Sequence, residues 1–200
     1  MHNFAPMSTS TDPQLASPGA GLPTIELWFA RLLFVLTRLR GSRETFVARF
    51  EQERAAIRAL VDSCPATQRG EQVLITRLRG LEDSSRNWSV WMTLDHLRIT
   101  NTAFARVINA LTHGKVPPGK ASTAAVKPSP SVTATVEADF EHSCDGVLAA
   151  ITEASDLKTR VRFAHPWFGP LNALGWAAMA GTHMGIHRVQ IQSIMAGLRR

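Results

Sequence analysis

Two histidines, His183 and His187, are four residues apart in the segment GTHMGIHRVQ. In an α-helix, residues four apart lie on the same face, with their side chains close together. Two imidazoles placed in this way can offer two ring nitrogens to one metal ion, at about 2.0–2.1 Å from each. Because the chain contains seven histidines, a pair at this spacing is expected by chance roughly 0.2 times. Further residues must therefore support a metal site.

The histidine pair continues the apolar face of its predicted helix. Spacings of three or four residues connect it with Gln190, Ile194 and Leu198. An imidazole on a buried face needs a partner, because an unpaired buried polar group costs about 1–3 kcal/mol. A metal ion would satisfy both rings at once.

His96 is the third candidate ligand, and it lies within a second amphipathic segment. It shares a stripe with Met92 and Ile99. Metal sites in helical bundles are built from side chains on facing helices. The sequence therefore predicts one divalent metal ion held by His96, His183 and His187. The pattern assigns no catalytic residue and no organic cofactor site.

The elements that must position these histidines are predicted to be helices. Helical periodicity starts at Thr24, which is suited to be an N-cap, and is interrupted at Gly41 by either a kink or a turn. The further segments with helical character are 42–61, 72–81 (short), 84–112, 131–155 and 171–198. No segment alternates for long enough to predict a sheet. The predicted fold class is all-α, an antiparallel bundle with an extended N-terminal helical region.

The chain is predicted to contain one folded domain, over residues 24–200, preceded by a tail. Residues 1–23 are rich in Ser, Thr, Pro, Gly and Ala, a composition that favours a flexible segment. In the first helix, the apolar residues around Trp28, Phe29 and Leu33 have the spacing of one buried helix face. Such a face can pack in the core or against a second copy of the chain, and periodicity does not separate the two.

Composition and charge exclude several classes of protein. The 22 Lys and Arg residues exceed the 16 Asp and Glu residues by six, but they are scattered and form no patch for a specific nucleic acid. The most apolar stretch, 27–37, is interrupted by Arg31 and is much shorter than the roughly 20 residues of a membrane span. Cys64 and Cys144 are too few for a disulfide framework. A cytoplasmic protein without a membrane partner is expected.

Two segments resemble the DinB-like (damage-inducible, YfiT-type) superfamily. They are WSVWMTLDHLRITN, which contains His96, and HPWFGPLNALGWAAMAGTHMGIHRVQIQSI, which contains the histidine pair. Members of this superfamily have one histidine on a long second helix and a His-x-x-x-His pair, followed by Gln, on the final helix. The resemblance covers about residues 24–198. The Pro- and Ser-rich loop at 113–130 and the extended front end depart from it, and both lie where a substrate pocket could be shaped.

The resemblance implies a four-helix bundle, often a homodimer, in which the three histidines hold zinc or nickel and leave coordination positions open. Characterised relatives include enzymes that use a low-molecular-weight thiol. The first hypothesis is therefore a metal-dependent S-transferase or isomerase that combines such a thiol with a small electrophilic substrate. Arg188, next to the second histidine of the pair, could meet an anionic group of the substrate or could be an ion-paired helix residue.

Two other hypotheses stay open. The second is a metal-dependent hydrolase, which needs a general base, and Glu141 or His142 could supply it if either points inward. The third is a non-enzymatic, dimeric, stress-related bundle in which the ion is structural. Structural zinc sites usually have four protein ligands. His165 is the candidate for the fourth ligand, but its position beside Pro166 and Trp167 favours a role in anchoring the connection before the last helix.

Overall fold

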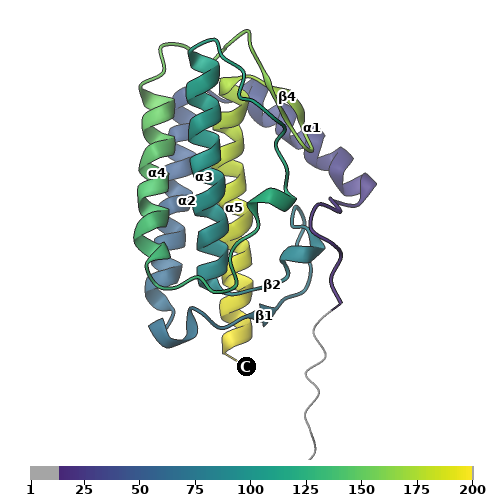
Figure 1. The fold of residues 1–200 in the computed structure, drawn as a ribbon, viewed down its shortest axis with the longest axis vertical. Helices are drawn as coiled ribbons and strands as arrows, with labels where there is room; N and C mark the ends of the chain where they lie inside the picture. Colours follow the sequence, from purple (N-terminus) through teal and green to yellow (C-terminus); the bar gives the residue numbers. More distant parts are fainter. Residues whose placement is uncertain (1–13, 200) are drawn as a thin grey trace, which may run out of the picture.

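The computed structural model describes residues 14–199, and within them the chain forms five α-helices (Figure 1). Their bounds are α1 Thr24–Arg40, α2 Arg43–Ser63, α3 Val90–Thr112, α4 Val136–Thr152 and α5 Ala173–Leu198. Two short antiparallel strand pairs join β1 Val73–Leu74 to β2 Asn87–Trp88, and β3 Phe163–His165 to β4 Gly169–Leu171. Three 3-10 turns are η1 Ala66–Gln68, η2 Asp83–Ser85 and η3 Ala124–Val126. The predicted all-α class is confirmed.

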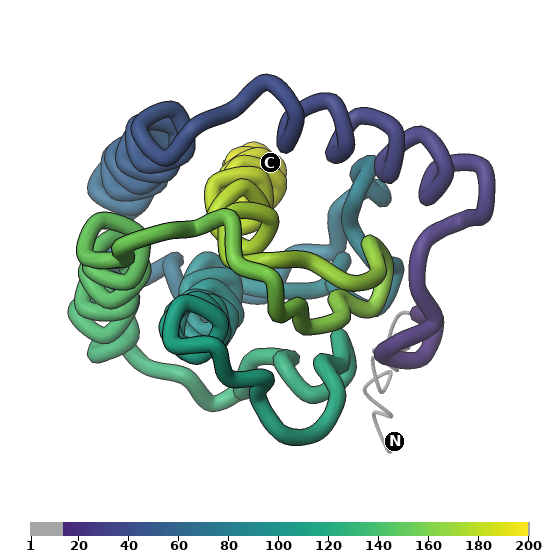
Figure 2. The backbone as a smooth tube through the Cα atoms, turned by 90° about the horizontal axis from the view of Figure 1, so that it is seen from above, coloured from purple at the N-terminus to yellow at the C-terminus, as the bar shows by residue number. Residues whose placement is uncertain are grey.

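Helices α2 to α5 form a four-helix bundle in which α3 packs on α4 and α5, and α2 packs on α5 and α4 (Figures 1 and 2). Helices α3 and α4 run in the same direction, since Trp91 near the start of α3 donates to Glu137 near the start of α4. Arg43 at the start of α2 donates to the carbonyl of Thr152 at the end of α4, so these two helices are antiparallel. The bundle therefore consists of two parallel pairs, α2/α5 and α3/α4, which are antiparallel to each other.

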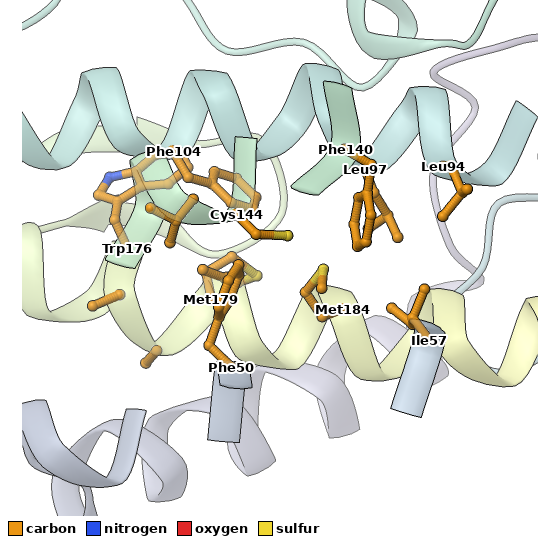
Figure 3. Close-up of a cluster of buried hydrophobic side chains, with 14 of the residues drawn as sticks. Phe50, Ile57, Leu94, Leu97, Phe104, Phe140, Cys144, Trp176, Met179 and Met184 are labelled. Carbon is orange, nitrogen blue, oxygen red and sulfur yellow. The ribbon is translucent and has the colours of Figure 1, made fainter. Parts of the chain in front are cut away.

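The core lies between these four helices, and each contributes its apolar face. Phe50 and Ile57 of α2 lie with Leu97 of α3 and Met184 of α5 in one fully buried cluster (Figure 3). Phe140 and Cys144 bring α4 into the same cluster. This continuous core fixes the relative positions of α3 and α5, the two helices that carry the candidate ligands.

The segment 72–81, which has helical character in the sequence, is not a helix. Val73 pairs with Trp88 across the short β1–β2 ladder. Gly80 has a φ of +82°, a left-handed conformation that interrupts a right-handed helix. The next helix consequently begins at Val90 and not at Ser84 or Ser85, with the hydroxyl of Ser89 accepting the N–H of Met92 as its cap.

The break at Gly41 is a true turn between two helices. Helix α1 begins at Thr24 itself, after Pro23, without a side-chain cap. Helix α2 begins after Ser42, whose hydroxyl accepts the N–H of Thr45 while the Thr45 hydroxyl accepts the N–H of Ser42. This reciprocal capping satisfies two backbone donors at the helix start.

Helix α1 lies outside the bundle (Figure 1). Most of its large apolar side chains are exposed. Among its residues, Phe34 is buried, and it packs on Phe168 with the ring centroids 4.7 Å apart. The large apolar side chains that stay between 44% and 76% exposed are Ile25, Trp28, Phe29, Leu32, Leu33, Val35 and Leu39. We call these seven residues the α1 face. A single chain therefore leaves exposed the apolar helix face that the sequence predicts to be buried.

The predicted tail is described in part. Residues 1–13 lie outside the described residues. Residues 14–23 contain a turn and contact the η2 region, where the N–H of Ala16 donates to Asp83 at 2.8 Å and the N–H of Gly19 donates to Glu82 at 3.4 Å. In the described part of the chain, no helix has both the length and the apolar character required to cross a membrane.

Truncating Ile57 tests the core. Ile57→Ala removes a fully buried side chain between α2 and its neighbours, and we expect the free energy of unfolding to fall by about 2–5 kcal/mol, against about 0.5–1.5 kcal/mol for Ile57→Val. Urea unfolding followed by circular dichroism measures both values. A loss below about 1 kcal/mol for Ile57→Ala would contradict the packing described here.

Candidate metal centre

The three histidines predicted from the sequence lie together at the interface of α3 and α5. Nε2 of His183 is 3.1 Å from Nε2 of His96 and 3.2 Å from Nε2 of His187. Two nitrogens bound at 2.0–2.1 Å to one tetrahedral ion are about 3.3 Å apart. The observed spacing is thus close to that of three ligands on one ion. His96 and His187 are buried, and His183 is partly buried.

Hydrogen bonds at the far side of two rings determine which nitrogen faces the centre. Nδ1 of His96 donates to the carbonyl of Val126 at 2.7 Å, and Nδ1 of His187 donates to Oε1 of Gln190 at 2.6 Å. The amide of Gln190 is oriented in turn, because its Nε2 donates to the carbonyl of Ser85 at 2.7 Å. Both acceptors are oxygens that cannot donate, so each Nδ1 carries the proton and each Nε2 presents a lone pair.

A metal ion would satisfy the nitrogen atoms of this cluster better than hydrogen bonds among the three rings can. With lone pairs on Nε2 of His96 and His187, a proton on Nε2 of His183 could be donated to one of them only. The other lone pair would then lack a partner, and Nδ1 of His183 is itself buried without one. Unpaired buried polar atoms destabilise the fold. A divalent ion at the centre would accept all three Nε2 lone pairs.

The electrostatic surroundings keep the rings neutral, which is the form that binds metals. Burial lowers the pKa of His96 from 6.5 to about 4. Burial also lowers the pKa values of His183 and His187 well below 6.5, and the repulsion of neighbouring imidazoles acts in the same direction. All three histidines are therefore ready to bind an ion at neutral pH without first losing a proton.

Aromatic rings enclose the cluster. The ring of Trp88 lies 5.2 Å from that of His96 and is stacked at 6.2 Å on that of His187, measured between centroids. Phe104 meets the ring of His183 edge-on at 5.5 Å. These contacts limit the rotation of the imidazoles, and Trp88, which does not line the cavity described next, covers one side of the cluster.

On the other side, the histidines line a cavity of about 680 Å³. Its walls come from the segment 80–85, α3, the loop 113–127, the β3–β4 hairpin and α5. Most of the lining is apolar, and the large side chains in it are Phe104, Val107, Phe163, Trp167, Trp176 and Met179. A cavity of this size is in the range that holds a small organic molecule.

The other residues singled out in the sequence lie elsewhere or play other parts. Arg188 pairs with Glu53 at 2.6 Å and does not line the cavity. Glu141 pairs with Arg54 at 2.6 Å and also with Arg58, and His142 is exposed, so neither lies at the histidine cluster.

His165 does line the cavity, but it is not part of the three-residue cluster. Its Nδ1 accepts the N–H of Trp167 at 3.1 Å within the β3–β4 hairpin. Burial lowers the pKa of His165 to about 4. The cysteines are also inert: both are buried and free, and burial raises the pKa of Cys144 to about 12.

Sequence reasoning missed the backbone acceptors that orient the rings. The carbonyl of Val126 belongs to the Pro-rich loop 113–130, and that of Ser85 belongs to η2. Every residue has a carbonyl, so no residue type marks these positions. The loop also lines the cavity with its residues 117–127, a role that the sequence raised but did not decide.

Comparison with known proteins places the chain in a family. The model of the DinB superfamily matches residues 49–191, which include all three histidines. The chain belongs to the DinB superfamily. Among solved structures, it is similar to TT2238, a four-helix bundle protein, with 22% identity and a TM-score of 0.56 over 76% of this chain and 98% of that one. This likeness supports the bundle fold. A comparison with curated proteins finds no match.

The buried imidazoles should make the metal-free protein sensitive to mild acid. The folded pKa of His96, about 4, lies below its unfolded value of 6.5, so the unfolded chain binds more protons between these values and stability falls as the pH falls. We expect a loss of about 2 kcal/mol from His96 alone between about pH 7.5 and pH 5. Urea unfolding in the presence of a chelator measures it.

The His96→Gln variant is the control for this pH dependence. It cannot take up the proton, so its unfolding free energy should change less over the same range, whatever its absolute stability. Equal pH dependence in the parent and the variant would show that His96 is not held neutral by burial.

Proposed function

We propose that this chain is a metal-dependent enzyme in which Nε2 of His96, His183 and His187 hold one divalent ion, most simply zinc or nickel. The observation that carries the proposal is the convergence of the three Nε2 atoms, two of them held with their lone pairs inward by Val126 and Gln190. Neutral imidazoles suit both ions.

The incomplete ligand set favours a reactive ion over a structural one. Within residues 14–199, the group that could hold a metal contains three histidines and no fourth His, Cys, Asp or Glu. Structural zinc sites are normally closed by four protein ligands, whereas catalytic sites keep a position for water or substrate. All three histidines line the cavity of about 680 Å³, so an ion that they held would be open to a small molecule in that cavity.

Among reactions at such an ion, we favour the transfer or isomerisation of a small electrophile with a low-molecular-weight thiol. A divalent ion with three neutral ligands keeps its charge and would lower the pKa of a bound thiol or water. The chain's own thiols cannot serve, because Cys64 and Cys144 are buried and burial raises the pKa of both. The thiol would therefore enter as a second small molecule.

Hydrolysis is the weaker candidate because the bases proposed for it are not at the site. Glu141 is bound by Arg54 and Arg58, and His142 is exposed on α4. His165 is in the cavity, but its lowered pKa of about 4 makes it a weak base at neutral pH. The apolar walls would instead protect an electrophile from water.

Metal content tests the proposal directly. We expect about one zinc or nickel ion per chain in protein purified without a histidine tag, and loss of the ion in His96→Ala and His183→Ala, because each removes one of three ligands. Elemental analysis after reconstitution measures this. His142→Ala, which removes an exposed histidine outside the cluster, is the matched control and should keep the ion.

The thiol reaction is tested on the same proteins. Metal-loaded parent and His142→Ala should consume a thiol together with an electrophile, while His183→Ala should lose at least a hundredfold of that rate. An absence of metal in the reconstituted parent would overturn the whole proposal. Full metal content with ester or amide hydrolysis, and no thiol consumption, would replace the transferase by the hydrolase.

We further propose that the α1 face, the seven exposed side chains defined above, packs against a second copy of the chain. These seven side chains are 44% to 76% exposed, so together they present an apolar area on the order of 800 Å². One partner of a standard protein interface contributes about this area. Apolar patches of this size are uncommon on monomers, and an apolar face is complementary to itself, as a twofold interface requires.

Leu33→Glu tests this dimer. Leu33 is 63% exposed in the single chain, so a charge there costs little in a monomer but would be buried in the interface. We expect sedimentation at about twice the monomer mass for the parent and for Val116→Glu, a 55% exposed apolar position outside the α1 face. Leu33→Glu should sediment as a monomer. A monomeric parent at tens of micromolar would overturn the dimer.

A further inference from the structure

The cavity at the histidine cluster has charges at its rim that the metal chemistry does not use. Arg106 of α3 and Lys120 of the loop after it both line the cavity and are exposed. Among the described residues, neither side chain forms an ion pair. The ion pair within the cavity lining joins Lys127 to Glu82. These two side chains therefore give the entrance a positive charge.

No acidic group in the lining cancels that charge. Glu82 is the one acid among the lining residues, and Lys127 holds it at 2.6 Å. Lys127 also donates to the hydroxyls of Ser84 and Ser85, at 2.9 and 3.0 Å, so its own donors are occupied. This pair is neutral as a unit. Arg106 and Lys120 thus remain as the uncompensated charges of the lining.

Between the charged entrance and the histidines, the wall is apolar and made partly of small residues. On α3, Thr100 and Ala103 lie in this stretch of the cavity lining, and their short side chains leave room. Phe104 and Trp176 close one side with rings whose centroids are 5.6 Å apart. A polar molecule would lose its hydration there without replacement, which costs several kcal/mol. An apolar body would not.

The helix gives the length of this path. Arg106 follows His96 by ten residues on α3, which corresponds to about 15 Å along the helix axis at 1.5 Å per residue. Side chains on a helix lean towards its N-terminus, so the guanidinium group can approach the histidines by part of that distance. A ligand that reaches both ends would be roughly 10–15 Å long.

From this arrangement we infer that the substrate is an elongated molecule with an apolar body and one terminal anionic group. Its anionic end is bound by Arg106 and Lys120 at the entrance, and its reactive end lies at His96, His183 and His187. The inference rests on the proposed function in placing the reactive end at the metal ion. The binding of the anionic end depends on the entrance residues alone, so the two can fail separately.

Binding of decanoate and decylamine to the zinc-loaded full chain tests the inference, because these probes share a body and differ in charge. Isothermal titration calorimetry should show decanoate binding at least tenfold more tightly than decylamine. The double variant Arg106→Gln/Lys120→Gln should lose at least tenfold of the decanoate affinity, because two charged donors are replaced by neutral ones. Lys115→Gln, an exposed lysine outside the cavity lining, should bind decanoate like the parent.

The His183→Ala variant shows which end of the cavity holds the carboxylate. Retained decanoate affinity in His183→Ala, with loss in the double variant, supports the inference even if no metal is ever found. Lost affinity in His183→Ala with none lost in the double variant would mean that the carboxylate binds the ion, and would overturn it. Equal binding of the two probes would overturn it as well, and would leave the proposed metal site intact.

Ala103→Trp provides a second measurement that does not depend on charge. The larger side chain would fill the space on the cavity stripe of α3, so decanoate binding should fall at least tenfold while metal content stays at one per chain. Unchanged affinity in a folded Ala103→Trp variant would show that decanoate binds outside the cavity, and would overturn the assignment.

Discussion

The feature on which the site depends is the hydrogen bond from Nδ1 of His96 to the carbonyl of Val126. It decides which nitrogen of the ring is free, and it connects α3 to the loop that lies over the cavity. The loop is held on both sides of Val126, because before it the hydroxyl of Thr123 donates to Glu82 at 2.9 Å. After it, Lys127 pairs with Glu82, and the N–H of Ser129 donates to Asp95, one residue before the histidine. The loop that orients the ring of His96 therefore also forms part of the cavity wall.

The direction of the helices explains why the loop is available. Because α3 and α4 are parallel, residues 113–135 must return along the length of the bundle before α4 can begin (Figure 1). A chain that crosses this distance can cover a cavity, which a short turn between antiparallel helices cannot. The β3–β4 hairpin closes the same cavity from the connection between α4 and α5. The connections therefore form much of the cavity wall, while the helices α3 and α5 supply the three histidines.

The cluster places three neutral imidazoles, an amide and two backbone carbonyls in contact inside a helical core. Such a network stabilises a protein only when every member has a partner, and here Nδ1 of His183 has none. A fold selected for stability alone would gain from apolar residues at these positions. Three converging Nε2 atoms that one cation would bind together, beside a cavity with a largely apolar wall and a positive entrance, are the pattern of a binding site.

Much of this could be predicted from the sequence because it depends on local spacing. The period of apolar residues identified the long helices, and the four-residue interval of His183 and His187 placed both rings on one helix face. His96 followed from the same reasoning applied to a second helix. The predicted segment 42–61 starts within one residue of α2, whereas Thr24, the predicted N-cap, is instead the first residue of α1.

What the tertiary structure decided involves contacts between distant segments. The segment 72–81 has helical periodicity, yet it pairs with residues 87–88 because the ladder and Gly80 determine its path. The acceptors at Val126 and Ser85 are backbone carbonyls, which no residue type identifies in the sequence. Arg188 and Glu141 form ion pairs with residues of α2, which the sequence did not predict. The sequence by itself determined which side chains share a helix face, because that follows from 3.6 residues per turn. Only the tertiary structure determined what each face meets, because long-range packing and hydrogen bonds select among faces that look alike in sequence.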